Sequence, residues 1–559
     1  MGHHLPPDIL DFYDKDVVDG RYAWSDFLSY LLDRYGERVC ADQRIDGAWR
    51  QWNHPDIVAL SLEVAEQLRE AGIRPGDRVA ILSESRPEFL AHFLGIGLVG
   101  ACLVPVDPKL SLSEADRILA HSEARLLFHS STFAQTAAML ERIAKSPFLE
   151  KLVEAGPSRF LASELRKLRA PRPISSPIIL LYTSGTSGDP KGVLLSVDNV
   201  LYGVQDGLRA FRPRPATYLS ILPMNHVFEL IGGSLRPLVG GSRVTYVESP
   251  QSPDLLNALK GHGIDTMLVV PAFLMMLQKR VTRELERDPR AARLWSFLGW
   301  LQETGAPRWV RRLASAPIRR GFAPELIRFA IGGAPTPLET HRFFERMGIH
   351  MLQGYGLSET TAATCISNEE CYREGASGRA LPGVEIRIDQ PGANGEGEIC
   401  IRGRAVMLGY YKREDLTREV MAEDGWFRTG DLGMVDGDGF VWIRGRVRNL
   451  IVLPSGKKVV PEEVEAWLLR QREVGEACVL GVGDKVWAVV TPAETWWREL
   501  GKKELDDEVS SALLEVLRAR DAAELSDYKV PAHYVVRGEP LPKTTTLKVK
   551  RGDVLASLQ

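Results

Sequence analysis

Several common patterns are missing from this chain, and each absence excludes a class of protein. The six cysteines are scattered without a CxxC pair, so zinc-ligand spacing is absent and a reducing, intracellular setting is expected. The net charge of −3 gives no support to a nucleic-acid partner. The first residues, MGHHLPPDILDFYDKD, lack a basic stretch followed by an apolar one, so we expect no signal peptide.

A long uninterrupted apolar run is also missing. The nearest to one, Phe89 to Val106, is broken by His92, Gly97, Gly100 and Pro105, and a buried helix followed by a buried strand explains it better than a membrane span. We therefore expect a cytoplasmic protein. Peripheral contact with the inner face of a membrane is the alternative.

The chain is long enough for at least two domains, at 559 residues. Apolar residues at helical spacing from Asp56 to Arg69 stop at Gly72, and Val79 to Leu82 read as a buried strand. This alternation of helix and strand predicts an α/β domain with a largely parallel sheet. After Gly395 short β-like runs follow, and a helix is expected to start at Pro461.

The segment from Gln278 to Arg328 is rich in arginine and helical in pattern. Its centre, RWVRRLASAPIRRGF (308–322), alternates arginines with apolar residues. A solvated helical face is the first interpretation, and a patch that touches an anionic membrane is the second.

The most specific local signal is YTSGTSGDPKG, Tyr182 to Gly192, which directly follows an apolar strand. Glycines let backbone N–H groups approach an anion, hydroxyls donate further hydrogen bonds, and Lys191 adds positive charge, so the loop suits a polyphosphate. It is not a Walker A loop, because Gly192 stands where Ser or Thr is required. An ordinary Ser/Gly turn is the weaker alternative.

Further motifs follow in order: LPMNHVFE (222–229), IGGAPTP (331–337), QGYGLSET (353–360), GEGEICIRGRAVMLGYY (395–411), WFRTGDLG (426–433), GRVRNLIVLPSG (445–456) and LPKTTTLKVKR (541–551). Together with the phosphate loop they resemble the adenylate-forming superfamily, which includes acyl- and aryl-CoA ligases, peptide-synthetase adenylation domains and luciferases. The resemblance runs from about residue 73 to the end of the printed sequence.

The resemblance implies a fold of two parts. A large N-terminal domain, residues 1–447, would hold layered α/β sheets and a β-rich subdomain. A small, mobile C-terminal α+β domain, residues 448–559, would pivot near Arg448, where the family usually has Asp or Lys. One orientation would serve adenylation and the other thiol transfer.

It also implies a reaction: a carboxylate attacks the α-phosphate of MgATP, pyrophosphate leaves, and the acyl group passes from AMP to the thiol of CoA. The site must neutralise two anions and align them. The co-substrates would be ATP and CoA with Mg²⁺, and no nucleic acid would take part.

Residues carried over from the family would divide among the parts of the nucleotide. The β- and γ-phosphates would contact Thr183, Ser184, Gly185, Thr186, Ser187, Gly188 and Lys191. Adenine and the α-phosphate would contact Gly333, Ala334, Pro335, Gly354, Tyr355, Gly356 and Ser358. The ribose would contact Asp431 and Arg446. Magnesium would be held by Glu359 and the hydroxyl of Thr183. Read alone, Tyr355 is a core aromatic and Asp431 a turn residue.

The acyl pocket would start at His226, Val227, Phe228, Gly332 and Gly354. His226 would lie beside the reacting carboxylate, although a lone histidine is often structural. For thiol transfer, Gly456 would let pantetheine pass, and Lys457 and Lys458 would meet the phosphates of CoA.

In the last motif the resemblance makes Lys548 the catalytic lysine of adenylation, while Lys543, Lys550 and Arg551 are expected to be solvated or surface-pairing charges. Leu547 departs from the glycine that other branches have before this lysine. That departure, the insertion and LPMNHVFE point to the long-chain fatty acyl-CoA synthetase branch. A ligase that loads an acyl carrier protein, a luciferase-type reaction and a non-catalytic nucleotide or lipid sensor remain as alternatives.

Overall fold

The computed structural model describes residues 11–45, 47–140, 143–145, 149, 158–183, 190–211, 215–247, 254–455, 457–500, 506–544 and 548–558. The chain divides into two compact units. Unit 1 comprises residues 1–385 and 401–427, and unit 2 comprises residues 386–400 and 428–559. The expected domain boundary and hinge at Arg448 lie within unit 2 and stay predictions.

The largest sheet of the described residues is in unit 1 and is mainly parallel. Its strands pair in the order β17–β16–β15–β14–β13–β11–β12–β2–β3. Parallel pairing runs from β2 through β12, β11, β13 and β14 to β15, so these strands end at one edge. The bounds are β2 (Val39–Ile45), β3 (Ala48–Asn53), β11 (Thr217–Ser220), β12 (Arg243–Tyr246), β13 (Thr266–Val269), β14 (Arg328–Ile331), β15 (His350–Tyr355), β16 (Cys365–Ile366) and β17 (Arg379–Ala380).

A second sheet of unit 1 pairs in the order β20–β10–β9–β5–β4–β6–β7. Here β9 and β10 form an antiparallel pair in which Thr183 lies opposite Lys191. The residues between them, 184–189, are outside the described part. The bounds are β4 (Arg78–Leu82), β5 (Cys102–Val106), β6 (Ala124–His129), β7 (Ala144–Lys145), β9 (Pro177–Thr183), β10 (Lys191–Ser196) and β20 (Gly409–Tyr410).

Two of the helices in unit 1 show why the sequence folds as it does. Helix α3 (His54–Glu70) starts with a capping box between Asn53 and Asp56, with Pro55 in its first turn. Helix α4 (Pro87–Val99) is buried along its whole length and ends at Gly100, whose φ of +71° suits glycine. Strand β5 follows at once. The expected helix-then-strand interpretation of residues 89–106 is therefore confirmed.

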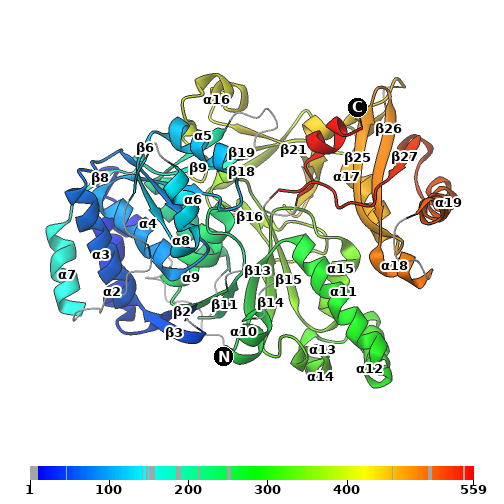
Figure 1. The fold of residues 1–559 in the computed structure, drawn as a ribbon, viewed down its shortest axis with the longest axis horizontal. Coiled ribbons are helices and arrows are strands. Elements are labelled where there is room, and N and C mark those ends of the chain that lie inside the picture. The colour runs from blue at the N-terminus through cyan, green and yellow to red at the C-terminus, as the bar shows by residue number, and fades with distance from the viewer. Residues whose placement is uncertain are drawn as a thin grey trace. The chain divides into compact units, whose positions relative to one another are not determined.

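The other elements of unit 1 complete its layers (Figure 1). They are η1 (Asp14–Asp16), β1 (Arg21–Tyr22), α2 (Trp24–Tyr35), α5 (Leu112–Ser122), η2 (Ser131–Phe133), α6 (Ala134–Met139), α7 (Ser158–Lys167), β8 (Arg172–Pro173), α8 (Val197–Phe211), η3 (Phe228–Leu235), α9 (Arg236–Val239), α10 (Asp254–Gly261), α11 (Pro271–Arg287), α12 (Pro289–Glu303), α13 (Arg308–Ala314), α14 (Ala316–Arg320), α15 (Leu338–Arg346), η4 (Ser358–Thr360) and α16 (Glu414–Val420). Among the described residues, no helix is both long and apolar enough to cross a bilayer.

The arginine-rich insertion lies in helices α11 to α14, and three arginines of its centre do not lie as expected. Arg308 donates to Glu345 Oε1 at 2.9 Å, Arg312 to the Glu325 carbonyl at 2.9 Å, and Arg319 to the Arg312 carbonyl at 3.0 Å. The expectation of a solvated basic face is wrong for these three arginines, because their guanidinium groups satisfy carboxylate and carbonyl acceptors within unit 1. Arg320 is exposed, as expected.

Unit 2 contains most of a four-stranded sheet, in which β21 and β22 pair antiparallel, and a smaller α+β part. The strands of the first sheet pair in the order β18–β19–β21–β22, and those of the last sheet in the order β25–β26–β27. Helix α17 starts at Pro461 as expected and buries Val464, Trp467 and Leu468. The bounds are β18 (Val384–Asp389), β19 (Gly397–Gly403), β21 (Phe427–Val435), β22 (Val441–Arg446), η5 (Val447–Asn449), β23 (Ile451–Val452), β24 (Lys458–Val459), α17 (Pro461–Arg470), β25 (Val474–Val482), β26 (Lys485–Pro492), α18 (Glu494–Glu499), α19 (Asp507–Glu524), η6 (Asp527–Lys529), β27 (His533–Val536) and α20 (Arg551–Ala556).

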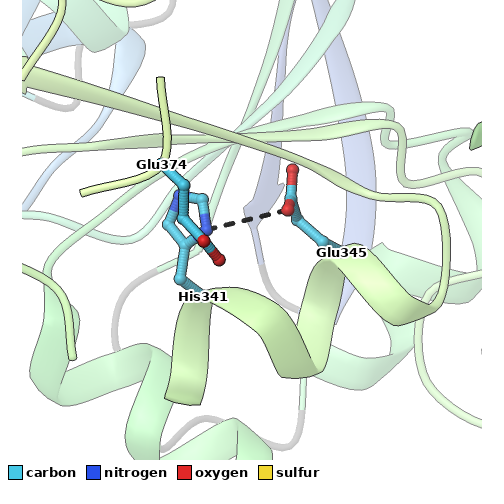
Figure 2. Close-up of side chains that lie close together, drawn as sticks. All are labelled: His341, Glu345 and Glu374. Carbon is cyan, nitrogen blue, oxygen red and sulfur yellow. Dashed lines mark ion pairs between the residues drawn. The ribbon is translucent and has the colours of Figure 1, made fainter. Parts of the chain in front are cut away.

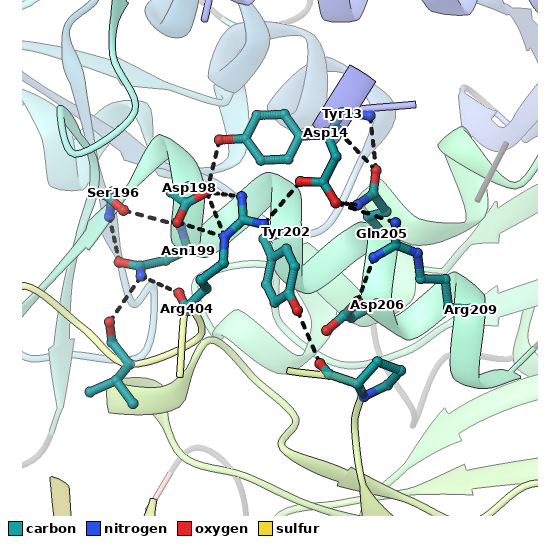
Figure 3. A network of polar contacts seen from close by, with 12 residues as sticks. Tyr13, Asp14, Ser196, Asp198, Asn199, Tyr202, Gln205, Asp206, Arg209 and Arg404 are labelled. Carbon is teal, nitrogen blue, oxygen red and sulfur yellow. Dashed lines mark hydrogen bonds and ion pairs between the residues drawn. The ribbon is translucent and has the colours of Figure 1, made fainter. Parts of the chain in front are cut away.

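A polar network centred on Arg404 ties distant segments of unit 1 together (Figure 3). The guanidinium group donates to Asp198 on α8 at 3.1 Å and to Asp14 in η1 at 2.9 Å. It also lies 3.9 Å from the centroid of the Tyr202 ring. One side chain therefore joins the N-terminal segment, α8 and the segment after β19.

The same segment is held a second time through its backbone. Asn199 Nδ2 donates to the Arg404 carbonyl at 2.6 Å and to the Val406 carbonyl at 2.9 Å. Residues 403–407, which we call the anchor segment, thus have a fixed path along α8.

We predict that Arg404→Met destabilises unit 1 by about 1–3 kcal/mol, less than for a fully buried pair because the side chain is 36% exposed. Thermal denaturation measures the change. Arg402→Met is the matched control, since Arg402 pairs with Glu385 at the surface and should cost less than about 1 kcal/mol. Equal effects of the two substitutions would contradict the role given to Arg404.

Candidate active site

The motif loops of unit 1 converge because the strands before them are parallel neighbours. LPMNHVFE follows β11, the IGGAPTP glycines follow β14, and QGYGLSET covers the end of β15. Strands β11, β13, β14 and β15 pair in parallel. In open α/β sheets, ligands bind at the carboxyl edge of the strands. Segments more than a hundred residues apart in sequence therefore form one edge.

The expected wall of the acyl pocket is partly assembled at this edge. A Cβ atom placed on Gly332 would lie 2.9 Å from Phe228 Cζ, so the Phe228 ring rests directly on the Gly332 backbone. Val227 is buried and His226 is half-buried. A Cβ atom placed on Gly354 would lie 3.2 Å from the Cys365 carbonyl, so Gly354 does not face Phe228. Phe228 and Gly332 are brought together, and Gly354 faces the neighbouring strand β16.

The expected adenine-binding loops lie next to each other. Gln353 Nε2 donates to the Ala334 carbonyl at 3.1 Å, which joins the end of β15 to the loop after β14. Gly333 has φ of +84° and, like Ala334 and Pro335, is exposed. Tyr355 is 8% exposed.

Glu359 has a defined position in the 3₁₀ turn η4, next to Ser358. Its Oε1 accepts a hydrogen bond from the Tyr410 hydroxyl at 2.9 Å. Its carbonyl accepts from Met407 N, in the anchor segment, at 2.8 Å. Lys191 Nζ lies 5.8 Å from the centroid of the Tyr410 ring. Tyr410 thus stands between the carboxylate and the lysine, a position that sequence reasoning missed although it falls in the quoted GYY.

The turn after Glu359 is strained. Thr361 and Ala362 have φ of +54° and +80°, a region that residues with a side chain seldom adopt. Thr361 Oγ1 donates to the Ala405 carbonyl of the anchor segment at 2.7 Å, which helps to hold the turn. Such conformations cost on the order of 1–3 kcal/mol each and cluster at functional sites. The strained turn is therefore a second, independent observation that indicates a functional role for Glu359.

The residues expected to hold magnesium fit that ion in kind. Glu359 offers one half-buried carboxylate, and Thr183 ends β9 opposite Lys191. Mg²⁺ is commonly bound through one or two carboxylates, with its other ligands from phosphate and water. Ser184, Gly185, Thr186, Ser187 and Gly188 lie outside the described residues, so their expected phosphate contacts stay predictions.

A second group of metal-type side chains, His341, Glu345 and Glu374, lies on and beside α15 (Figure 2). Its charges are already neutralised. Glu345 accepts from Arg308 at 2.9 Å, and Glu374 accepts two hydrogen bonds from Arg342 at 2.8 and 3.0 Å. Burial lowers the pKa of His341. We interpret the group as an ion-pair cluster rather than a metal centre.

Glu229 is an unexpected feature of the LPMNHVFE segment. It lies in the π-helix η3 and is fully buried, and neither carboxyl oxygen has a hydrogen-bond partner among the described residues. Its carboxyl group folds back onto Gly233, where a Cβ atom would come within 2.6 Å of it. Desolvation raises the pKa of Glu229 to about 8. A π-helical turn with a buried acid is unusual and often marks a functional region.

In unit 2 the two expected ribose ligands are paired. Asp431 on β21 lies opposite Arg446 on β22, and Arg446 Nε is 2.7 Å from Asp431 Oδ1. Asp431 is 5% exposed, and its backbone N–H donates to Thr429 Oγ1 at 3.0 Å. The arginine thus pairs with a buried carboxylate and holds it in position.

The other expected residues of unit 2 are at its surface. Lys548 is exposed, and its carbonyl accepts a hydrogen bond from Thr544 N at 2.7 Å. Arg448, Lys457 and Lys458 are exposed too. Gly456 lies outside the described residues, and the roles given to these side chains stay predictions.

The neighbours of Lys548 divide into two kinds. Lys543 is a surface charge paired with Glu476, as expected. Arg551 is not: it donates to Glu465 at 2.7 Å, to Glu462 at 3.1 Å and to the Val479 carbonyl at 2.9 Å. These ion pairs raise its pKa, although burial opposes them. The expectation of a surface charge is wrong for Arg551, which fastens α20 to the rest of unit 2.

The fold and the grouping of its motifs are those of an adenylate-forming enzyme. The family model described as AMP-binding enzyme matches residues 32–411, and the one described as AMP-binding enzyme C-terminal domain matches residues 463–548. The chain belongs to the AMP-binding enzyme family, within the adenylate-forming superfamily.

Several relatives are similar over most of the chain. Long-chain-fatty-acid–CoA ligase ACSBG1 of Bos taurus is 30% identical over 78% of this chain and 65% of its own length. FadD15 of Mycobacterium tuberculosis, also named a long-chain-fatty-acid–CoA ligase, is 30% identical over 79% of this chain and 77% of its own. Feruloyl-CoA synthase of Amycolatopsis is 29% identical over 88% and 91%. The chain therefore spans about two thirds of the length of ACSBG1.

Solved structures show the same fold. O-succinylbenzoate CoA synthetase (MenE) of Bacillus subtilis, in complex with AMP, has a TM-score of 0.72 at 23% identity and covers 96% of this chain and 98% of its own. ATP-bound MatB of Rhodopseudomonas palustris has a TM-score of 0.74 at 23% identity with the same coverage. The expected α/β fold with layered sheets and a smaller C-terminal domain is confirmed.

The buried acid of the LPMNHVFE segment predicts a pH-dependent stability. Between about pH 5 and pH 8, folded Glu229 keeps a proton that the unfolded chain has lost. The free energy of unfolding therefore falls as pH rises through this window, and Glu229 changes it no further above pH 8. The slope is on the order of 1.4 kcal/mol per pH unit. Glu229→Gln lacks this titration.

We therefore expect the melting temperature of Glu229→Gln, relative to wild type, to increase between pH 5 and pH 8.5 in a differential scanning experiment. Glu339→Gln, at an exposed position of α15, is the control and should give a constant difference. A pH-independent difference for Glu229→Gln would show that the carboxyl group is not protonated in the fold.

Proposed function

We propose that this chain activates a carboxylic acid with MgATP, releasing pyrophosphate to form an acyl-AMP, and then transfers the acyl group to the thiol of CoA. The observation that carries the proposal is the grouping of Glu359, Tyr410 and Lys191, with Lys191 opposite Thr183 on the paired strands β9 and β10. A carboxylate for a hard cation and a lysine for phosphate are what a reaction between two anions requires.

Each remaining residue has a role in the same proposal. Phosphates lie between the 184–188 loop, Lys191 and Ser358, with Mg²⁺ on Glu359 and Thr183. Adenine lies at Tyr355 and the loop formed by Gly333, Ala334 and Pro335. Asp431 accepts from the ribose hydroxyls, with Arg446 holding it. Lys548 neutralises the carboxylate and α-phosphate in the adenylation orientation, and Arg448 is the hinge.

We further propose that the acid is a fatty acid of medium to very long chain. The apolar contact between Phe228 and Gly332 beside His226 supports this, as do the names of the ACSBG1 and FadD15 relatives. The feruloyl-CoA synthase relative favours an aryl acid as the second candidate. The thiol of a carrier protein is the alternative acceptor to CoA. A cytoplasmic location with peripheral membrane contact through residues 278–328 completes the proposal.

Pyrophosphate release with a panel of acids tests this function. We expect release that requires ATP, Mg²⁺ and acid, with a kcat/KM at least about tenfold higher for palmitate than for ferulate, because an apolar chain gains about 0.8 kcal/mol per buried CH₂. Octanoate should lie between them. If ferulate is preferred, the fatty-acid assignment fails and the ligase reaction stands; if no acid supports release, the ligase reaction fails.

Lys548→Ala tests the division of labour between the two half-reactions. We expect acyl-AMP formation to fall by about 10²–10³-fold, the usual loss when one group that stabilises transition-state charge is removed. Thiol transfer from supplied acyl-AMP should change by less than about threefold. Lys550→Ala, another exposed lysine two residues away, is the control. Equal loss of both half-reactions would contradict the role of Lys548.

A further inference from the structure

The insertion helices α12 and α13 present large apolar side chains to solvent. Phe297 and Trp300 on α12 are 47% and 56% exposed, and Trp309 and Leu313 on α13 are 65% and 69% exposed. The rings of Phe297 and Trp300 stack with centroids 5.8 Å apart. We call these four residues the apolar stripe; Figure 1 shows the two helices that carry it.

The stripe faces outward because the arginines between its members face inward. Arg308 bonds to Glu345, and Arg311 bonds to the carbonyl of Glu345 at 2.5 Å. Arg312 is turned toward the Glu325 carbonyl. With the polar side of α13 occupied by these bonds, Trp309 and Leu313, one helical turn apart, are left on the open side. This is the reverse of an ordinary surface helix.

The stripe is large for an unused surface and small for a stable dimer. Its exposed area is about 400–500 Å², taking about 150–250 Å² for a large side chain that is fully exposed. Helices α12 and α13 contact each other, and large apolar side chains exposed together on neighbouring elements often mark a functional surface. A stable protein interface needs about 800 Å² from each partner.

Exposed cations lie on α12 and on α14, the helix that follows α13. On α12, Arg293 precedes Phe297 and Trp300 at helical spacing. Arg320 is exposed at the last position of α14, the short helix that follows α13. Glu303 is the exposed acid at the end of α12. Tryptophan and phenylalanine flanked by arginine are typical of surfaces that enter the headgroup region of a bilayer that contains anionic lipid.

We propose that the apolar stripe docks this chain on an anionic lipid surface, with Trp300 and Trp309 inserted among the headgroups and Arg293 and Arg320 against lipid phosphates. The inference rests on the proposed function, since a fatty acid of long chain partitions into such a surface. It assigns the membrane contact on α13 to Trp309 and Leu313 instead of Arg308, Arg311 and Arg312, which bond within unit 1.

Co-sedimentation of the full chain with vesicles tests the proposal without ATP or acid, so a failure of the ligase reaction does not affect the result. Vesicles of phosphatidylcholine alone are compared with vesicles that contain 30% phosphatidylglycerol. We expect binding to the second kind, and a partition coefficient lowered by about tenfold or more in Trp300→Ser/Trp309→Ser, because two buried indole rings are lost.

Phe160→Ser is the matched control, since Phe160 on α7 is 59% exposed and lies outside the stripe; its binding should equal that of wild type. The melting temperature of the double variant should also stay close to that of wild type, which shows that it folds. Undiminished binding of the double variant, or no binding by wild type, would overturn the proposal. So would a dimer, seen by light scattering, that the double substitution abolishes without any effect on vesicles.

Discussion

The parallel register of β11, β13, β14 and β15 is the constraint on which the candidate site of unit 1 depends. Parallel strands end at the same edge of a sheet, so the segments that follow β11, β14 and β15 meet there, whatever their separation in sequence. The contact of Phe228 with Gly332 and the bond from Gln353 to Ala334 are local consequences of this register. A slip of one residue would turn every side chain of a strand to the other face and separate these pairs.

The anchor segment, residues 403–407, connects this edge to the rest of unit 1. On one side it is fixed to α8 by Arg404 and Asn199. On the other it binds the carbonyl of Glu359 and the hydroxyl of Thr361, and Tyr410 follows three residues later. A strained turn persists only when its surroundings over-determine it. The network around Arg404 therefore stabilises, through one short segment, the position of the carboxylate proposed to hold magnesium.

Local patterns in the sequence predicted the local features well. The helix at Pro461 and the helix-then-strand at residues 89–106 follow from periodicity and capping, which depend on near neighbours. Side-chain partners were harder to predict, since Tyr410 and Glu359 are 51 residues apart and Arg551 and Glu465 are 86 apart. The orientation of the arginines of α13 was predicted wrongly for the same reason, because their acceptors belong to other elements. Motif order identified the family, while tertiary contacts decided which charges are structural.

The central claim is that a substrate carboxylate attacks the α-phosphate of ATP directly, and isotope transfer tests it. Palmitate labelled with ¹⁸O in both carboxyl oxygens is incubated with the full chain, MgATP and CoA, and the products are analysed by mass spectrometry. Formation of the acyl-AMP and its cleavage by the thiol leave one carboxyl oxygen on the nucleotide, so we predict AMP that carries one ¹⁸O and unlabelled pyrophosphate. Label in orthophosphate, or turnover that yields unlabelled AMP, would contradict this account.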